Sequence, residues 1–566
     1  MAAMTDLTVY NMPTSPPNWD RVGVFYMSFC VTWTTILLTG MVFCFFNRHI
    51  PILRVRGLPL SFSAIALLHV YWIMGQITHP IGAAMPTVLA YDIQYFTMGI
   101  YLPLGIALFQ ASNLRFLHVA NLQKQFVHPE RQIEKEANGP RSFSWLSYLR
   151  EMDYMKRTLS LIGLGMVLQF IVTVAMWVAC KKYHPTYGIP GTEIHGATVA
   201  EQIVYLGRGW EWWPSLLWQV IWTWIAAPIL IWQTRGIRDT MGWHTQTLAC
   251  CLSGLHATPM YLIATYVPAF AKVNVYFTPS NWIHVSIMLW EIFTVFVPIF
   301  HVIRLWAMSK KATASTTQYN SMSETMLNKP SSSMELRSIS SSTLGEKNQS
   351  AQSIHEYTVD RIYTMDALDH VLSKNPEQLQ EFAALSDFSG ENIAFLSEVA
   401  LWKSFWPSLE ETKTSDAFNQ ALRIYVNFIS TQDAEFPLNI SSHALKGMQS
   451  IFEQPARSLF GEKTINTTSP FEADPFAPPL SQDFEGVQVA YENRYTGAIP
   501  VGFDMAIFNN LQDEIKYLVL TNTWPKFVES MRRRSTDTER SDYTAQSKTS
   551  LKSWISRQRL KLRSFR

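Results

Sequence analysis

The sequence predicts an all-α protein, in which a seven-helix transmembrane bundle precedes a cytosolic bundle of soluble helices. Residues 22–306 contain seven long apolar segments, and charged residues are sparse there but frequent afterwards. In residues 362–453, apolar side chains recur every three or four positions, as they do on one face of a helix. The alternation of period two that marks a half-buried strand is lacking.

The first apolar segment, residues 22–46, has no charged side chain and exceeds the roughly 20 residues that cross a bilayer. Aromatic residues make up 13% of the chain, which suits a membrane protein. The seven segments together form the predicted transmembrane domain, residues 22–306. The other six spans are predicted at about 58–77, 95–114, 158–178, 213–232, 248–270 and 282–303.

Lysine and arginine in the loops predict the orientation, because cytoplasmic loops are enriched in them. With residues 1–21 outside, the inner segments hold sixteen of these residues and the outer segments five. We therefore expect a multi-pass protein of the plasma membrane, with an extracellular N-terminus and everything after residue 304 in the cytosol. The net charge of +2 does not indicate a nucleic-acid partner.

Glu291 lies in the middle of the seventh segment, where an ionisable side chain is costly unless it has a partner. His69 and His256 are the candidate partners. The three residues form either an intramembrane ligand or proton site, or a structural hydrogen bond between helices. The five cysteines all lie within or beside apolar segments and are expected to be buried thiols. Aromatic and histidine side chains near the outer ends are interpreted as interface anchors: Trp210, Trp212, Trp213, Trp282 and His284.

Two segments outside the bundles have a biased composition. Residues 307–354 are predicted to be a flexible linker, because serine is frequent there and large apolar residues are scarce. Residues 531–566 form a basic tail with eleven lysines or arginines and three acidic residues. The tail is either a solvated segment or a basic amphipathic helix that contacts lipid at the inner leaflet.

The stretch F-S-G-E-N-I-A-F-L, residues 388–396, predicts the start of a helix. Ser389 is a good N-cap, and the helix dipole favours a carboxylate such as Glu391 in the first turn. Glu391 lies about 160° around the helix from the apolar Ile393, given 3.6 residues per turn. Local physics therefore places Glu391 and Asn392 away from the apolar stripe, and both an N-terminal capping role and a role in recognition remain open.

The stretch 388–396 resembles the signature of the regulator of G-protein signalling (RGS) domain. Four further blocks resemble that family in the same order: A-L-R-I-Y-V-N-F-I at 421–429, L-N-I at 438–440, F-D-M-A at 503–506 and L-x5-W-P-K-F at 518–527. The resemblance implies an RGS-type helical bundle over residues 355–530. A proline-containing, acidic insert at 461–500 is expected to be disordered.

The resemblance implies that the cytosolic domain binds the α subunit of a heterotrimeric G protein, Gα, and accelerates its GTP hydrolysis. Such a domain is not itself an enzyme: it supplies no catalytic residue, cofactor or metal, because Gα carries its own arginine in cis. Seven spans joined to this domain resemble an arrangement of plants and filamentous fungi that regulates G-protein signalling. The implied Gα-binding residues are Ser389, Glu391, Asn392, Asn439, Leu518, Asn522 and Lys526.

Alternatives from other classes remain open. Asn522 and Lys526 stand where the family often has aspartate and arginine, so the domain could dock Gα as a scaffold without accelerating hydrolysis. A transporter with a regulatory cytosolic domain would instead use Glu291 and the histidines. A small-molecule ligand of the transmembrane domain is a further candidate partner.

Overall fold

A computed structural model of the chain describes residues 7–127, 154–327, 362–406, 414–434, 436–460 and 494–534. Its contacts separate a unit built mainly from residues up to 303 from a unit built mainly from residue 304 onward. Among the described residues every element is helical, apart from one isolated bridge between Cys180 and Ile189. The predicted all-α fold is confirmed.

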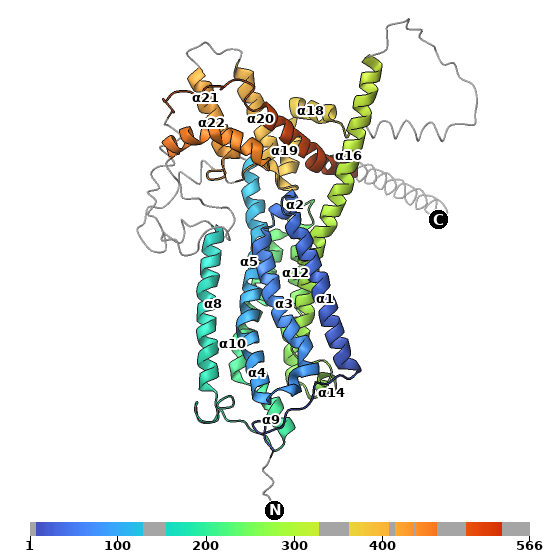
Figure 1. Cartoon of the computed structure of the whole chain (residues 1–566), viewed down its shortest axis with the longest axis vertical. Helices are drawn as coiled ribbons and strands as arrows, with labels where there is room; N and C mark the ends of the chain where they lie inside the picture. The colour runs from blue at the N-terminus through green and yellow to red at the C-terminus, as the bar shows by residue number, and fades with distance from the viewer. Residues whose placement is uncertain are drawn as a thin grey trace, which may run out of the picture. The chain divides into compact units, whose positions relative to one another are not determined.

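The first unit contains seven helical stretches that are long and apolar enough to cross a membrane (Figure 1). This is the predicted number, and each stretch covers most of the segment that its sequence indicated. The third, fifth and seventh stretches are longer than predicted. The third extends beyond both predicted ends, the fifth mainly before its predicted start and the seventh beyond its predicted end. Their bounds are Arg21–Phe46, Leu58–Ala84, Thr87–Phe126, Lys156–Ala179, Val199–Thr234, Trp243–Tyr266 and Asn281–Ala314.

Several of these stretches consist of more than one helix. The main elements are α1 (Arg21–Phe46), α3 (Leu58–Ile81), α4 (Thr87–Phe96), η2 (Thr97–Tyr101), α5 (Leu102–Gln123), α8 (Tyr154–Ala179), α9 (Val199–Leu206), α10 (Trp213–Val220), η5 (Ile221–Ala226), α11 (Ala227–Thr234), α12 (Trp243–Gly254), α13 (Ala257–Tyr266), α15 (Asn281–Glu291), η7 (Ile292–Phe296) and α16 (Val297–Leu327). A short helix, α2 (Pro51–Arg54), connects α1 and α3.

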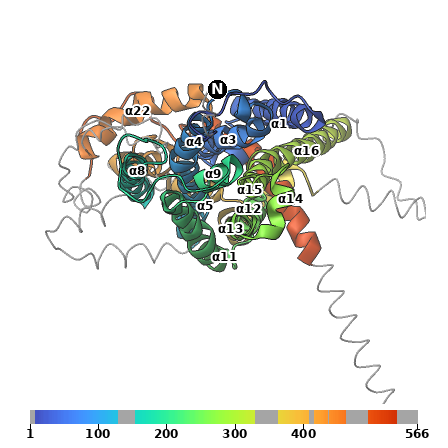
Figure 2. The same ribbon diagram turned by 90° about the horizontal axis from the view of Figure 1, so that it is seen from below.

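The interior of the first unit is formed around α3 and α5, which pack closely along each other (Figure 2). A Cβ on Gly105 of α5 would lie 2.7 Å from Cγ of Leu68 on α3, so the glycine permits this approach. By contrast, α1 and α8 leave most of their side chains uncovered by protein, which is the pattern of helices that face lipid.

Two prolines lie within the predicted second and third spans. Pro59 lies in the first turn of α3, where no backbone N–H is required. Pro103 lies in the first turn of α5, directly after the π-helical turn η2. Both prolines are therefore compatible with the predicted second and third spans.

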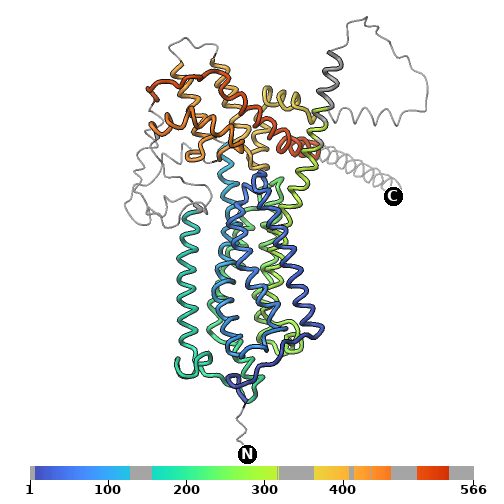
Figure 3. Tube along the Cα trace, viewed as in Figure 1, coloured from blue at the N-terminus to red at the C-terminus, as the bar shows by residue number. Residues whose placement is uncertain are grey.

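The second unit consists of α18 (Met365–Lys374), α19 (Pro376–Leu385), α20 (Gly390–Phe405), α21 (Thr414–Ile424), the π-helical turn η10 (Tyr425–Ile429), α22 (Ser442–Phe460), α24 (Asn509–Leu518) and the π-helical turn η11 (Val519–Thr523). Figure 3 traces these helices in yellow to red. Residues 524–534 continue as helix after η11.

Aromatic side chains hold the second unit together. Phe452 of α22 stacks on Phe418 of α21, with 5.7 Å between ring centroids, and on Phe508, at 5.9 Å. Trp402 of α20 meets Phe508 edge-on at 5.3 Å. Aromatic contacts of this kind add about 0.5–1.5 kcal/mol each beyond the area they bury. One aromatic core therefore joins α20, α21 and α22 to the start of α24.

Two predicted boundaries are corrected. The predicted flexible linker begins as helix, because α16 continues to Leu327 without an intervening proline or glycine. The end of the predicted disordered insert is ordered: Tyr495 N donates to Asn419 Oδ1 at 2.7 Å, and Asn419 Nδ2 donates to Tyr495 O at 3.2 Å. This reciprocal pair anchors the segment from 494 on α21.

Other predictions fall on residues that the structure does not describe. These are the remainder of the linker (328–354), the body of the insert (461–493) and the basic tail from 535 onward. The five cysteines are all described, and each is a free, buried thiol, as expected.

Candidate functional site

The site of the second unit begins at the end of α19, where the chain turns sharply. The amides of Ser386 and Asp387 both donate to Phe382 O, and the amide of Ser389 donates to Ala383 O. Phe388 makes the turn with a φ of 47°, in the left-handed region that usually favours glycine. Its buried ring anchors the strained residue between α19 and α20.

This turn directs Asp387 into the protein, where its carboxylate is fully buried. One oxygen, Oδ1, accepts a hydrogen bond from Lys526 Nζ at 2.7 Å. The other, Oδ2, accepts from the hydroxyls of Thr523 at 2.8 Å and Ser389 at 3.1 Å. The carboxylate therefore joins the start of α20 to η11 and the helical residues that follow it. We call Asp387, Ser389, Asn522, Thr523 and Lys526 the Asp387 cluster.

Ser389 occupies the N-cap position of α20 as predicted, but its side chain does not cap the helix. The hydroxyl instead bonds Asp387 and lies 3.1 Å from Thr523 Oγ1. The local cap is replaced by a long-range bond, because the left-handed Phe388 turns the serine side chain toward η11.

Asn392 was predicted to point away from the apolar stripe, and this prediction is wrong: its side chain is 4% exposed. Its carbonyl oxygen Oδ1 has no hydrogen-bond partner among the described residues. A buried carbonyl without a partner is costly, and native structures contain few of them. Glu391, its neighbour, is half-buried.

Asn522 and Lys526 lie one helical turn apart, and Lys526 Nζ donates to Asn522 Oδ1 at 2.8 Å. Both side chains are buried. Asn522 lies in the π-helical turn η11, a distortion that is frequent at functional sites. Its amide nitrogen Nδ2 has no hydrogen-bond partner among the described residues. The two asparagines thus each present one unused polar atom.

The other two predicted residues lie beside this region. Leu518 is the half-buried last residue of α24 and leads directly into η11. Asn439 is half-buried in the segment between η10 and α22. Ser441 N donates to Glu514 Oε1 at 2.5 Å, so this segment is attached to α24.

The intramembrane candidates are only partly brought together. His69 Nδ1 lies 2.8 Å from Glu291 Oε1, and the carboxylate also accepts from Trp33 Nε1 at 2.6 Å. Thr34 Oγ1 lies 3.0 Å from the other ring nitrogen of His69. His256 contacts Ser286 instead, at 3.4 Å. The polar group in the middle of these helices therefore consists of Glu291 and His69. Trp33 of α1 contacts Glu291, and Thr34 of α1 contacts His69.

Sequence reasoning missed several of these residues. Asp387 directly precedes the stretch 388–396. An acidic residue beside a phenylalanine at the end of a helix could have indicated a buried carboxylate. Thr523 carried no signal beyond its place beside Asn522. Trp33 offered a weak one, because an indole N–H in a membrane needs an acceptor.

Among the residues that the structure describes, no group of three or more histidine, cysteine or acidic side chains is placed to hold a metal ion. The Asp387 cluster stiffens the junction of α20 and η11, and the unused atoms of Asn392 and Asn522 lie at that junction. Its chemistry is suited to binding a polar partner.

Comparison with known families identifies the second unit. Residues 367–484 match the family described as "Regulator of G protein signaling domain". No curated protein matches the chain.

Proposed function

We propose, from the regulator of G protein signaling domain that this chain carries after seven candidate membrane spans, that the protein binds a Gα subunit and accelerates its GTP hydrolysis. The domain marks the chain as a regulator of G-protein signalling. The observation that supports Gα binding most strongly is the junction of α20 and η11, where Asn392 and Asn522 each hold a polar atom without a partner.

The proposed mechanism is differential binding. A partner that is held best in the transition-state arrangement passes through a lower barrier, although the binding domain contributes no reacting group. The Asp387 cluster suits this task, because side chains locked by mutual hydrogen bonds need little reorganisation when the partner arrives. Lys526 and Ser389 are positioned by Asp387. A donor on Gα would satisfy Asn392 Oδ1, and an acceptor on Gα would receive a hydrogen bond from Asn522 Nδ2.

The location follows from the charge of the loops. Sixteen lysine or arginine residues lie in the segments assigned to the cytosol and five in those assigned to the outside. This bias supports an orientation with the N-terminus outside and the Gα-binding domain in the cytosol. We place the protein in the plasma membrane as part of the proposal. There the domain would damp signalling by shortening the lifetime of Gα bound to GTP, under the control of a ligand at the transmembrane unit.

The test is single-turnover GTP hydrolysis on a Gα subunit of the source organism, with the full-length protein in lipid nanodiscs. We expect faster hydrolysis with the native protein and no acceleration with the double variant Asn392→Ala, Asn439→Ala. The matched control is Glu398→Ala, an exposed position of the same helix, which should retain full acceleration. Acceleration that survives the double variant, or is absent from the native protein on every Gα tested, contradicts the proposal.

The same preparation distinguishes a docking scaffold. A scaffold binds GDP-bound Gα and Gα bound to a transition-state mimic equally well. The proposed regulator binds the mimic-bound form more tightly, because only that preference lowers the barrier.

A further inference from the structure

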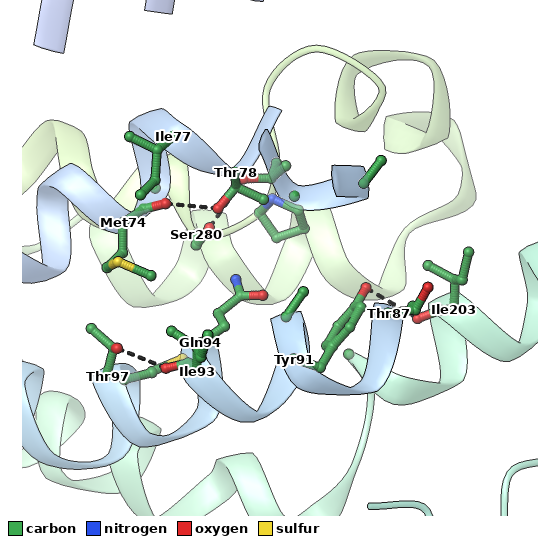
Figure 4. Close-up of a pocket in the computed structure, with 18 of the residues that line it drawn as sticks. Met74, Ile77, Thr78, Thr87, Tyr91, Ile93, Gln94, Thr97, Ile203 and Ser280 are labelled. Carbon is green, nitrogen blue, oxygen red and sulfur yellow. Dashed lines mark hydrogen bonds between the residues drawn. The ribbon is translucent and has the colours of Figure 1, made fainter. Parts of the chain in front are cut away.

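A cavity of about 480 Å³ lies in the first unit, at the end of the bundle where the N-terminal segment begins. It is enclosed by α3, α4, η2, α9, α13, α15 and the residues before α1. Figure 4 shows α3 and α4 on opposite sides of it, with Gln94 extending from α4 into the space between them. Its volume falls within the range of about 300–1,000 Å³ that small-molecule sites occupy.

The wall of this cavity is mainly apolar, and Arg208 is its only lysine, arginine or acidic residue. The Arg208 guanidinium lies over the ring of Tyr266, 5.9 Å from its centroid. Most hydroxyls of the wall are bonded within the protein: Thr78 donates to Met74 O and Thr97 to Ile93 O, both at 2.7 Å. These bonds are drawn in Figure 4, which also shows the amide of Gln94 in the space that a ligand would fill.

Three buried polar atoms of the wall are exceptions: Asn274 Oδ1, the Tyr71 hydroxyl and His284 Nε2. The hydroxyl of Tyr71 and Nε2 of His284 have no hydrogen-bond partner among the described residues, and each side chain is 2% exposed. The two rings lie side by side, with 4.7 Å between their centroids. His284 was predicted to be an interface anchor, and this is wrong: its ring is buried against α3.

A chain of hydrogen bonds sets the role of His284 Nε2. Tyr26 donates its hydroxyl to Tyr276 O at 2.6 Å and accepts from Asn281 Nδ2 at 3.3 Å. Asn281 therefore presents its carbonyl oxygen to His284 Nδ1, 3.0 Å away. Because Nδ1 must be the donor in that bond, Nε2 of the neutral ring is an acceptor.

Gly75 permits this arrangement. A Cβ at position 75 would lie 1.8 Å from Cε1 of His284, which is too close for two carbon atoms that are not bonded to each other. The ring can therefore lie beside Tyr71 only because residue 75 of α3 has no side chain. A glycine that brings two unbonded polar groups to one wall is an independent indication of a binding site.

We propose that this cavity binds an uncharged, mainly apolar small molecule that carries a hydroxyl group. The hydroxyl donates to His284 Nε2 and accepts from the Tyr71 hydroxyl, while the apolar remainder fills the space between α3 and α4. The inference rests on the proposed function only for the role of the ligand, which would control the regulator of Gα; the binding itself is independent of it.

The test compares two isomeric probes, n-nonanol and n-octyl methyl ether, which have the same number of heavy atoms. Only the alcohol can donate a hydrogen bond. Binding to the full-length protein in lipid nanodiscs is measured by saturation-transfer difference NMR, with protein-free nanodiscs subtracted. We expect the alcohol to bind more tightly by roughly 2- to 12-fold, the effect of one neutral hydrogen bond.

Three variants test the residues. Tyr71→Phe removes a hydroxyl that has no partner among the described residues, so the fold is retained. Because the oxygen of either probe can accept from that hydroxyl, the variant should weaken the binding of both probes and leave the preference for the alcohol in place. Gly75→Ala displaces His284 and should abolish the preference. Gly82→Ala is the matched control, because a methyl group there meets only Thr78 Cγ2, at 3.7 Å, and should leave the preference intact.

Equal binding of the two probes to the native protein, an alcohol preference that survives Gly75→Ala, or binding of both probes that is unchanged by Tyr71→Phe overturns the proposal. The assay contains no G protein, so either result leaves the proposed function untouched. Conversely, a native protein that prefers the alcohol but accelerates no Gα contradicts the proposed function and supports the cavity.

Discussion

Removing the charge of Asp387 should loosen the second unit at the junction of α20 and η11. Asp387→Leu leaves the Lys526 ammonium buried, with Asn522 Oδ1 as its recorded acceptor. Breaking a buried ion pair by removing one partner costs about 3–5 kcal/mol. The hydroxyls of Ser389 and Thr523 lose an acceptor as well, but they can turn toward each other across 3.1 Å. We therefore expect a loss of about 3–5 kcal/mol.

A double-mutant cycle separates the ion pair from the loss of packing. Lys526→Met alone removes the cation that is paired with the buried carboxylate, and should cost about 3 kcal/mol. The double variant Asp387→Leu, Lys526→Met replaces both charges by apolar side chains of similar size, which is often close to neutral. We expect the double variant to be more stable than either single variant.

Hydrogen exchange of the α20 amides, measured on the full-length protein in nanodiscs, reports this effect locally. A loss of about 3 kcal/mol raises the exchange rate by roughly a hundredfold or more. Additive effects of the two single substitutions would refute the reasoning, since they would mean that Asp387 and Lys526 do not stabilise each other. Glu398→Ala serves as the control, because its side chain is exposed.

Three further predictions concern the first unit. Gly105→Ala should destabilise the packing of α3 on α5 by about 1–3 kcal/mol in thermal unfolding, because its Cβ would lie 2.7 Å from Leu68 Cγ. The control is Gly163→Ala, whose methyl group meets nothing within 4 Å and should be neutral or stabilising. Asp20 caps α1, and the hydrogen bond that it accepts from the Gly23 amide holds its pKa below the ordinary value. The stability that Asp20 contributes is therefore present at neutral pH and is lost as pH falls through that lowered pKa. Asp20→Ala should reduce thermal stability and remove this acid dependence. Glu291→Leu should lower thermal stability, because its two bonded neighbours would be left buried without an acceptor; loss of a substrate flux on Glu291→Gln would instead favour a transporter.

Local patterns were enough to predict the helical fold, the seven spans and the presence of the RGS domain. Each of these depends on residues close together in the chain: the length of an apolar run, a repeat of three or four, or a short motif such as residues 388–396. The same reasoning failed where composition alone was used. Residues 307–327 are rich in serine and threonine, yet they continue α16, because no proline or glycine interrupts the helix. Within it, the hydroxyls of Thr313 and Thr317 bond back to carbonyls one turn earlier.

Side-chain direction near a helix end was also beyond sequence reasoning. Asn392 was placed away from the apolar stripe by helix periodicity, but periodicity says nothing of what packs against the helix from elsewhere. The neighbouring Phe388 adopts a left-handed φ that no propensity would assign to phenylalanine. This one residue turns Ser389 away from its capping role and aims Asp387 at η11.

The sequence by itself therefore determined which segments are helices, which of them are apolar enough for a membrane and which family the second unit belongs to. Only the tertiary structure decided the partners of the polar side chains. Asp387 meets Lys526 across 139 residues of chain, and Glu291 meets His69 across 222. His284 owes its place to the missing side chain of Gly75 on another helix. The physical reason is that hydropathy and helix periodicity act along the chain, whereas hydrogen bonds and close contacts depend on where folding brings distant residues together.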